Sequence, residues 1–390
     1  MVLTELLTAE NWFQDRLKAM KNRERGRNSN LYFKLRDGIK WSDGKDVTAG
    51  DFEYSWKRLV NPETAADYNY MLDGVVNATE IMAGEKDPDE LAAKALDDKT
   101  FEVTLVNDLN YFEELCAFPA MMPVREDMIE KAGDQWTFDT ATYISNGAYK
   151  LKEWTHNSQI VVEKNENYYD VENLGPETIT FKLMDDQNAM LSGFNSGELD
   201  FIEDVPQAEI ANLIASGDMK IVDYIGTYYV CFQTQKAPFD DPRVRKAFSL
   251  AIDRTYIVNQ VTQSGQVEAG GFVPSGVYDA DGADGDDFRT VGGDYYKPTD
   301  ADYEANCDEA RQLLADAGYP NGEGFPVVEY LYNTSDAHKA VAEALQFMWE
   351  EELGVKVTLN NQEWAAFLQT RKDGDYSIAR NGWIADTTTR

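Results

Sequence analysis

The chain has 390 residues, a length typical of two or three domains. It carries 70 acidic and 36 basic side chains, which give a formal net charge of −34. This charge argues against binding to nucleic acid, which requires basic patches, and against adsorption to anionic lipid. No run of residues reaches the roughly 18–20 apolar side chains that a membrane helix needs, and the first 30 residues lack the apolar segment of a signal peptide.

Cysteines and histidines are too few for a metal or redox motif. The three cysteines form no C-x-x-C pair, and we interpret them as small buried apolar residues. With only two histidines, His156 and His338, a histidine-rich metal site is excluded. The Asp-rich stretch 279–287 departs from the calcium-loop pattern at Ala283. We therefore expect no metal and no cofactor.

The first half of the chain shows both helical and strand periodicity. Residues 1–30 are predicted to form an amphipathic helix and a basic linker. Thr48 starts a helix in which Asp51 occupies the capping-box position, and residues 86–98 are predicted to form another helix. Alternating apolar and polar residues predict strands at 31–35, 100–107, 146–154, 158–165 and 177–184. Helices interleaved with strands favour an α/β arrangement.

The second half alternates more regularly. Residues 237–262 begin with a turn and are predicted to continue as a long helix. Residues 325–390 predict strand, helix, strand, helix, strand. In such a sheet, ligands lie beyond the carboxyl ends of the strands. This places Tyr332, Asn333 and residues 380–386 near a ligand-binding cleft.

Enzyme motifs are absent from the sequence. The patterns of a serine-hydrolase nucleophile, a phosphate-binding loop, a dinucleotide-binding loop and a zinc metalloprotease do not occur. We therefore expect that the chain is not an enzyme. Among 70 acidic residues, pairs of carboxylates occur in any case. An acidic extracellular hydrolase that uses two carboxylates, such as a glycosidase, stays open as an alternative.

Seven stretches occur along the chain in one order: LRDGIKWSDGKDVTAGDFEYSWKRLVNPETA, ALDDKTFEVTL, SNGAYKLKEW, TQKAPFDDPRVRKAFSLAIDR, YNTSDAHKAVA, LNNQEWAAFLQTR and ARNGWIAD. Together they resemble the oligopeptide-binding proteins of extracytoplasmic solute-binding protein family 5. The resemblance runs over residues 31–386.

The resemblance implies an α/β chain with the two-lobed periplasmic-binding-protein type II fold and an extra domain on lobe one. The implied parts are an atypical N-terminal segment at 1–30, the extra domain at 31–125, lobe one at 126–235 and lobe two at 236–390. The first 30 residues do not match the family pattern, and the chain stops four residues after Asp386. We therefore expect that the N-terminal segment is not native and that lobe two is incomplete at its C-terminus.

Four charged residues gain ligand-binding roles from the resemblance. Asp386, which follows a Gly-Trp pair, would hold the α-ammonium group of a bound peptide. Arg380, Arg371 and His338 would take the peptide carboxylate. Such partners are needed because burying an unpaired charge is costly. The ordinary alternatives are a turn cap for Asp386, a surface ion pair for Arg380 and a first-turn helix position for His338.

Four aromatic residues complete the implied site. Trp383 and Trp364 would line side-chain pockets, although a single tryptophan is more often part of a core. Tyr68 or Tyr70 would approach the ligand from the extra domain.

The expected function is capture of extracellular oligopeptides between closing lobes and delivery to the permease subunits of an ABC-type importer. Binding of a non-peptide solute on the same fold is the second alternative. We expect a monomer that is periplasmic or lipid-anchored at the cell surface, with short peptides as ligands and no nucleic acid.

Overall fold

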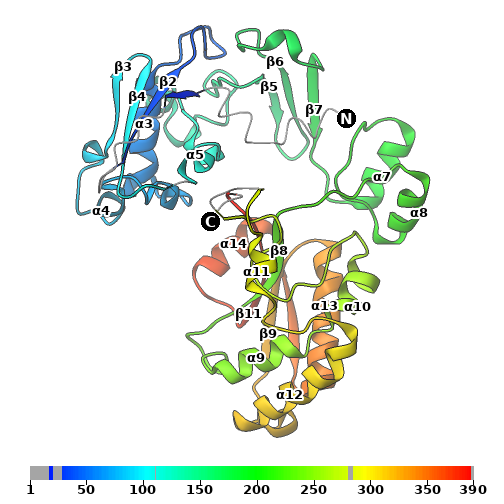
Figure 1. The fold of residues 1–390 in the computed structure, drawn as a ribbon. Helices are drawn as coiled ribbons and strands as arrows, with labels where there is room; N and C mark the ends of the chain where they lie inside the picture. The colour runs from blue at the N-terminus through cyan, green and yellow to red at the C-terminus, as the bar shows by residue number, and fades with distance from the viewer. Residues whose placement is uncertain (1–16, 21–28, 110, 280–283, 388–390) are drawn as a thin grey trace. The chain divides into compact units, whose positions relative to one another are not determined.

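The computed structural model describes residues 17–20, 29–109, 111–279 and 284–387. Internal contacts divide the chain into two compact units, Met1–Met184 and Asp185–Thr388. Both units mix helices and strands (Figure 1), which confirms the predicted α/β class. The predicted boundaries near 125 and 235 concern lobes and an extra domain, and they stay predictions.

The first unit contains two antiparallel sheets, one of order β1-β2-β4-β3 and one of order β5-β6-β7. The strands are β1 (Leu17–Met20), β2 (Ser29–Leu35), β3 (Ala93–Asp97), β4 (Thr100–Leu105), β5 (Tyr149–Thr155), β6 (Gln159–Lys164) and β7 (Thr178–Lys182). The α-helices are α3 (Ala49–Val60), α4 (Ala78–Met82), α5 (Phe112–Leu115) and α6 (Glu126–Ala132).

Helix α3 packs on the larger sheet and begins as predicted. The carboxylate of Asp51 accepts a hydrogen bond of 2.8 Å from the backbone N–H of Thr48, which confirms the capping box. The indole of Trp56 is buried and meets the ring of Phe101 edge-on, at 5.0 Å between centroids. The helix thus anchors the core of this unit.

Two helix predictions in the first unit are wrong in part, at residues 93–97 and at residues 17–20. Residues 93–97, within the predicted helix 86–98, form strand β3, in which Ala93 is buried and pairs with Val103 of β4. Pairing in a sheet outweighs the helical preference of this Ala-, Leu- and Lys-containing segment. Residues 17–20 pair with β2 as strand β1, and the rest of the predicted N-terminal helix lies outside the described residues.

The second unit is built on a four-stranded sheet of order β10-β9-β11-β8. Its strands are β8 (Gly226–Phe232), β9 (Val328–Asn333), β10 (Val357–Gln362) and β11 (Ile378–Ile384). Its α-helices are α7 (Gln187–Ser196), α8 (Ile210–Ser216), α9 (Pro242–Leu250), α10 (Arg254–Tyr256), α11 (Phe288–Gly292), α12 (Tyr303–Asp316), α13 (Asp336–Leu353) and α14 (Trp364–Lys372). The alternation predicted for residues 325–390 is confirmed by β9, α13, β10, α14 and β11.

Helix α13 carries the main core of the second unit. It begins after Ser335, whose hydroxyl accepts a hydrogen bond from the third helical N–H, and it ends at Gly354 with a φ of 65°. The side chain of Trp349 is fully buried, and its indole N–H donates to the carbonyl oxygen of Phe248 on α9 over 2.8 Å. Helix α13 is thereby fixed at its C-terminal half.

The long helix predicted for 237–262 is interrupted. Helix α9 ends at Leu250, and the carboxylate of Asp253 accepts a hydrogen bond of 2.8 Å from the N–H of Tyr256. An aspartate in this position caps a new helix start rather than continuing an old one. Helix α10 follows, and residues 257–262 are wound as a π-helix.

Truncation of Trp349 is expected to destabilise the second unit strongly. The substitution Trp349→Ala removes a buried ring and leaves the Phe248 carbonyl without its donor, so the expected loss is about 3–5 kcal/mol. Urea unfolding monitored by circular dichroism measures this loss. The matched control is Trp364→Ala, because that side chain is 53% exposed and should cost little. Equal losses in the two variants would contradict the packing described here.

Candidate functional site

Parallel pairing brings three strand ends of the second unit to one edge of its sheet. Strand β9 runs parallel to β10, with Asn333 opposite Gln362, and parallel to β11, with Leu331 opposite Ala379. Strand β11 then continues past β9 toward Asp386. We call this edge the carboxyl edge, and it is the place where the sequence puts a ligand.

The sheet has two covered faces, and successive residues of a strand alternate between them. Ile378 packs in the core beneath α13, whereas Ala379 packs with Phe367 of α14. Figure 1 shows α13 and α14 on opposite sides of the strands. By the same alternation, Arg380 belongs to the α13 face, and Trp383 belongs to the α14 face.

Arg380 lies in a polar cluster at the carboxyl edge on the α13 face. One terminal nitrogen donates to the side-chain oxygen of Asn333 over 3.1 Å. Its guanidinium carbon lies 5.1 Å from the centre of the Tyr228 ring, a cation–π distance. The hydroxyl of Tyr228 lies 3.4 Å from Nδ1 of His338 in the first turn of α13. Two predicted carboxylate ligands, Arg380 and His338, are therefore brought together around one tyrosine.

The surroundings of His338 disfavour its protonated form. Burial, and then the positive charge of Arg380, lower the pKa of His338 from 6.5 to about 4. Its position in the first turn of a helix adds the partial positive charge of the helix N-terminus. His338 is thus a neutral imidazole near pH 7, and Arg380 supplies the formal charge of the cluster.

Tyr228 and Tyr330 add two hydroxyls to this face. Burial raises the pKa of both phenols, for Tyr330 well above the ordinary value. Each phenol therefore keeps its proton at neutral pH and can donate it. The side-chain nitrogen Nε of Arg380 is buried and makes no hydrogen bond to the described residues. The cluster is rich in donors, which suits an anionic group.

Asp386 follows the end of β11. The N–H of Ala385 donates to the carbonyl oxygen of Ile225 over 2.9 Å, which extends the pairing with the segment before β8 up to the neighbouring residue. Burial raises the pKa of the Asp386 carboxyl group. Among the described residues, no ion pair satisfies this carboxylate. Such a half-buried acid fits a cationic ligand group.

Arg371 and Trp364 lie apart from the Arg380 cluster, on α14. The Trp364 ring stacks 5.8 Å from that of Phe367, and the guanidinium of Arg371 lies 5.3 Å from the same Phe367 ring. Helix α14 starts at the carboxyl edge with Trp364, and Arg371 lies about two turns further along the helix. Trp364 and Trp383 are both more than a third exposed.

Tyr68 and Tyr70 belong to the first unit. Their rings lie 5.7 Å apart, and the Tyr68 ring lies 5.0 Å from that of Phe118. Both side chains are 39% exposed. They form a small exposed aromatic group on that unit, and their role toward a ligand stays a prediction.

Tyr228 is a functional candidate that the sequence did not reveal. It lies in the segment Gly226–Phe232, which comes shortly before the TQKAPF stretch. This nearness to a family motif was the one signal in the sequence that could have pointed to Tyr228. Strand β8 pairs antiparallel with β11, with Tyr228 opposite Gly382, and this register puts Tyr228 diagonally beside Arg380.

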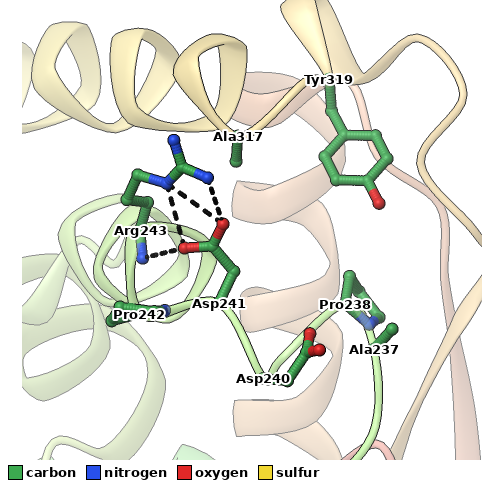
Figure 2. Close-up of a pocket in the computed structure, with 8 residues that line it drawn as sticks. All are labelled: Ala237, Pro238, Asp240, Asp241, Pro242, Arg243, Ala317 and Tyr319. Carbon is green, nitrogen blue, oxygen red and sulfur yellow. Dashed lines mark hydrogen bonds and ion pairs between the residues drawn. The ribbon is translucent and has the colours of Figure 1, made fainter.

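A separate hollow of about 670 Å³ lies next to the start of α9 (Figure 2). It follows the end of β8, where Phe232 pairs with Ile378 at the start of β11, so it lies at the edge opposite the carboxyl edge. Figure 2 shows Arg243 bound to the carboxylate of Asp241, and its Nη1 donates to the carbonyl oxygen of Asp316 over 2.8 Å. Arg243 and Asp241 thus pair with each other, which leaves neither of these two charges free for a ligand.

The described residues hold neither a metal-binding cluster nor a membrane-spanning helix. They contain no group of three or more His, Cys, Asp and Glu side chains placed to hold a metal ion. They also contain no helix that is long and apolar enough to cross a membrane. Part of the Asp-rich stretch 279–287 lies outside the described residues.

Comparison with known proteins points to one group. A model of the bacterial extracellular solute-binding proteins, family 5 Middle, matches residues 9–390. The periplasmic oligopeptide-binding protein OppA of Salmonella typhimurium is 40% identical over 359 residues, which are 91% of this chain and 64% of that relative. The chain therefore spans less than two thirds of the length of this relative.

Solved structures agree with the sequence comparison. The murein tripeptide binding protein MppA of Escherichia coli has a TM-score of 0.85 and 34% identity, over 95% of this chain and 70% of that protein. Haemophilus influenzae OppA, in complex with RPPGFSPFR, has a TM-score of 0.84 and 32% identity, over 94% of this chain and 71% of that protein. The predicted fold of periplasmic binding proteins is confirmed.

Acidification is expected to destabilise the second unit through His338. Its pKa in the folded state lies below that of an unfolded histidine, so the unfolded state takes up a proton first as pH falls. The contribution to stability is complete above about pH 6.5 and is lost as pH falls toward about 4. Urea unfolding at several pH values measures how the free energy of unfolding changes with pH. This pH dependence should be weaker in His338→Gln than in the unaltered chain.

His156→Gln is the matched control, since this second histidine is exposed in the first unit. It should keep the pH dependence of the unaltered chain. An unchanged pH dependence in His338→Gln would contradict the buried neutral imidazole described above.

Proposed function

We propose that this chain binds short peptides, because it belongs to the bacterial extracellular solute-binding proteins of family 5 and carries groups of both charges at one edge of a sheet. The observation that carries the proposal is the cluster of Arg380, Tyr228 and His338 at the carboxyl edge, with Asp386 beyond the same strand. A peptide with free ends carries one charge of each sign and needs a partner for each.

In this proposal Asp386 receives the α-ammonium group of the peptide, and Arg380 with His338 receives the carboxylate. A half-buried carboxylate and a donor-rich cluster are the chemical complements of these two groups. Arg371 is a further cation for the carboxylate of a peptide of different length, because it lies about two turns along α14. Trp364 and Trp383 offer exposed indole faces to peptide side chains.

The names of the relatives support the same ligand class. The Salmonella typhimurium relative is an oligopeptide-binding protein, and the Haemophilus influenzae structure holds RPPGFSPFR. We extend this to delivery of the peptide to the permease subunits of an ABC-type importer, by a monomer outside the cytoplasmic membrane. Tyr68 or Tyr70 is the proposed contribution of the first unit to the ligand site.

A binding protein should release its ligand unchanged. The purified chain is expected to carry a mixture of short peptides, which native mass spectrometry detects and which denaturation releases for sequencing. Added RPPGFSPFR should bind and be recovered with its mass intact. Shorter products would instead support the hydrolase. A folded chain that is empty and ignores RPPGFSPFR would overturn the peptide proposal.

Neutralising Asp386 should lower the affinity of the chain for peptides that have a free amino terminus. Asp386→Asn removes the charge that pairs with the α-ammonium group, so the expected loss in affinity is roughly 10- to 100-fold. Isothermal titration calorimetry with RPPGFSPFR and its N-acetylated form measures the loss, which should be small for the acetylated peptide.

Asp375→Asn is the matched control for this experiment. Its side chain is 85% exposed before the start of β11, at the other end of the strand from Asp386. It should bind both peptides as the unaltered chain does. The proposed role of Asp386 fails if Asp386→Asn weakens the free and acetylated peptides equally.

A further inference from the structure

Tyr228 contacts both Arg380 and His338, the two proposed partners of a ligand carboxylate. The face of its ring lies 5.1 Å from the guanidinium carbon of Arg380, and its hydroxyl lies 3.4 Å from Nδ1 of His338. The ring centroids of Tyr228 and His338 are 5.7 Å apart. Tyr228 therefore connects Arg380 of β11 with the first turn of α13.

The protonation of the two groups allows the Tyr228 hydroxyl to donate to Nδ1 of His338. The phenol is protonated, because burial raises its pKa, and the imidazole is neutral. A neutral imidazole has one nitrogen that accepts and one that carries a proton. When the Tyr228 hydroxyl donates to Nδ1, the ring proton must reside on Nε2. His338 is then a neutral donor through Nε2.

The second contact restricts Arg380. Its guanidinium carbon lies over the Tyr228 ring while Nη1 donates to the side-chain oxygen of Asn333. A guanidinium held on one side by an aromatic face and at one nitrogen by an amide keeps its remaining N–H groups in a fixed direction. Less side-chain entropy is then lost when a ligand binds.

We infer that Tyr228 is a positioning residue, which sets the Nε2–H tautomer of His338 and the orientation of Arg380 so that both donate to one ligand carboxylate. This inference rests on the proposed peptide-binding function for the identity of the carboxylate. The arrangement of Tyr228, His338 and Arg380 does not depend on that function.

Nuclear magnetic resonance of the peptide-free chain tests the tautomer directly. The chain has only two histidines, so the ring nitrogens of His338 can be assigned by comparison with His338→Gln. We expect a single Nε2–H tautomer in the unaltered chain. Tyr228→Phe should give a mixture of tautomers and a higher pKa for His338, since the neutral ring loses its donor.

The adjacent tyrosine provides a matched control. Tyr229 lies on the opposite face of β8, where its hydroxyl accepts a hydrogen bond of 2.7 Å from Asn381. Tyr229→Phe removes the same atom from the neighbouring position and should leave the His338 signals unchanged. A single Nε2–H tautomer that persists in Tyr228→Phe would overturn the inference.

Peptide binding tests the consequence for the ligand. RPPGFSPFR with a free carboxylate is compared with the same peptide ending in an amide. Tyr228→Phe should lower the affinity for the carboxylate form by roughly 2- to 10-fold, as expected for one lost hydrogen bond. The affinity for the amide form should fall less. Tyr228→Leu also removes the cation–π contact with Arg380 and should lower the preference for the carboxylate form further.

The two arms separate this inference from the proposed function. If the unaltered chain binds neither peptide, the proposed function fails, and the tautomer measurement still decides whether Tyr228 positions His338. If peptides bind and the preference for the carboxylate form is the same in Tyr228→Phe, the proposed function stands and the positioning role is wrong. Circular dichroism of each variant verifies that it is folded.

Discussion

Parallel pairing of β9 with β10 and β11 is the constraint on which the candidate site depends. Parallel strands end at the same edge, so the segments that follow them must gather there. The segment after β9 leads into α13 and His338, and the segment after β10 leads into α14 and Trp364. Arg380 follows Ala379, which pairs with Leu331 near the end of β9, so Arg380 lies close to the edge. Strand β11 extends beyond its neighbour, and Asp386 follows its end.

Burial, more than ion pairing, determines the charge states of the titratable groups in the site. In a chain with a net charge of −34, Arg380 is held by an amide oxygen and an aromatic face rather than by an acid. An acid beside Arg380 would neutralise the charge that an anionic ligand needs. Arg243 of the same unit, by contrast, pairs with Asp241, and it lies at the opposite edge of the sheet.

The sequence was informative where local signals were strong. The helix that begins after Thr48 was predicted, and the alternation over 325–390 identified the strands that carry the site. Residues 93–97 were misread because their composition favours a helix, whereas their partner in β4 decides the structure. Local patterns do not report such pairing.

The site itself was predictable only in part. The motif positions of Arg380 and His338 were visible in the sequence, but their meeting at Tyr228 depends on a strand register and a helix start far apart in the chain. Tyr228 lies within an apolar run in which nothing distinguishes it from Tyr229. Only the alternation of faces gives one tyrosine to the cluster and the other to Asn381.

The two helices that flank the site differ in how many core side chains they carry. Helix α13 buries six residues, among them Val341, Leu345 and Trp349, whereas α14 buries only Phe367. Substitutions along α13 therefore disturb folding together with the position of His338. The α14 side can accept new side chains at little cost to the core, so divergence of ligand preference among related chains should accumulate around Trp364 and Arg371 while the α13 side stays constant.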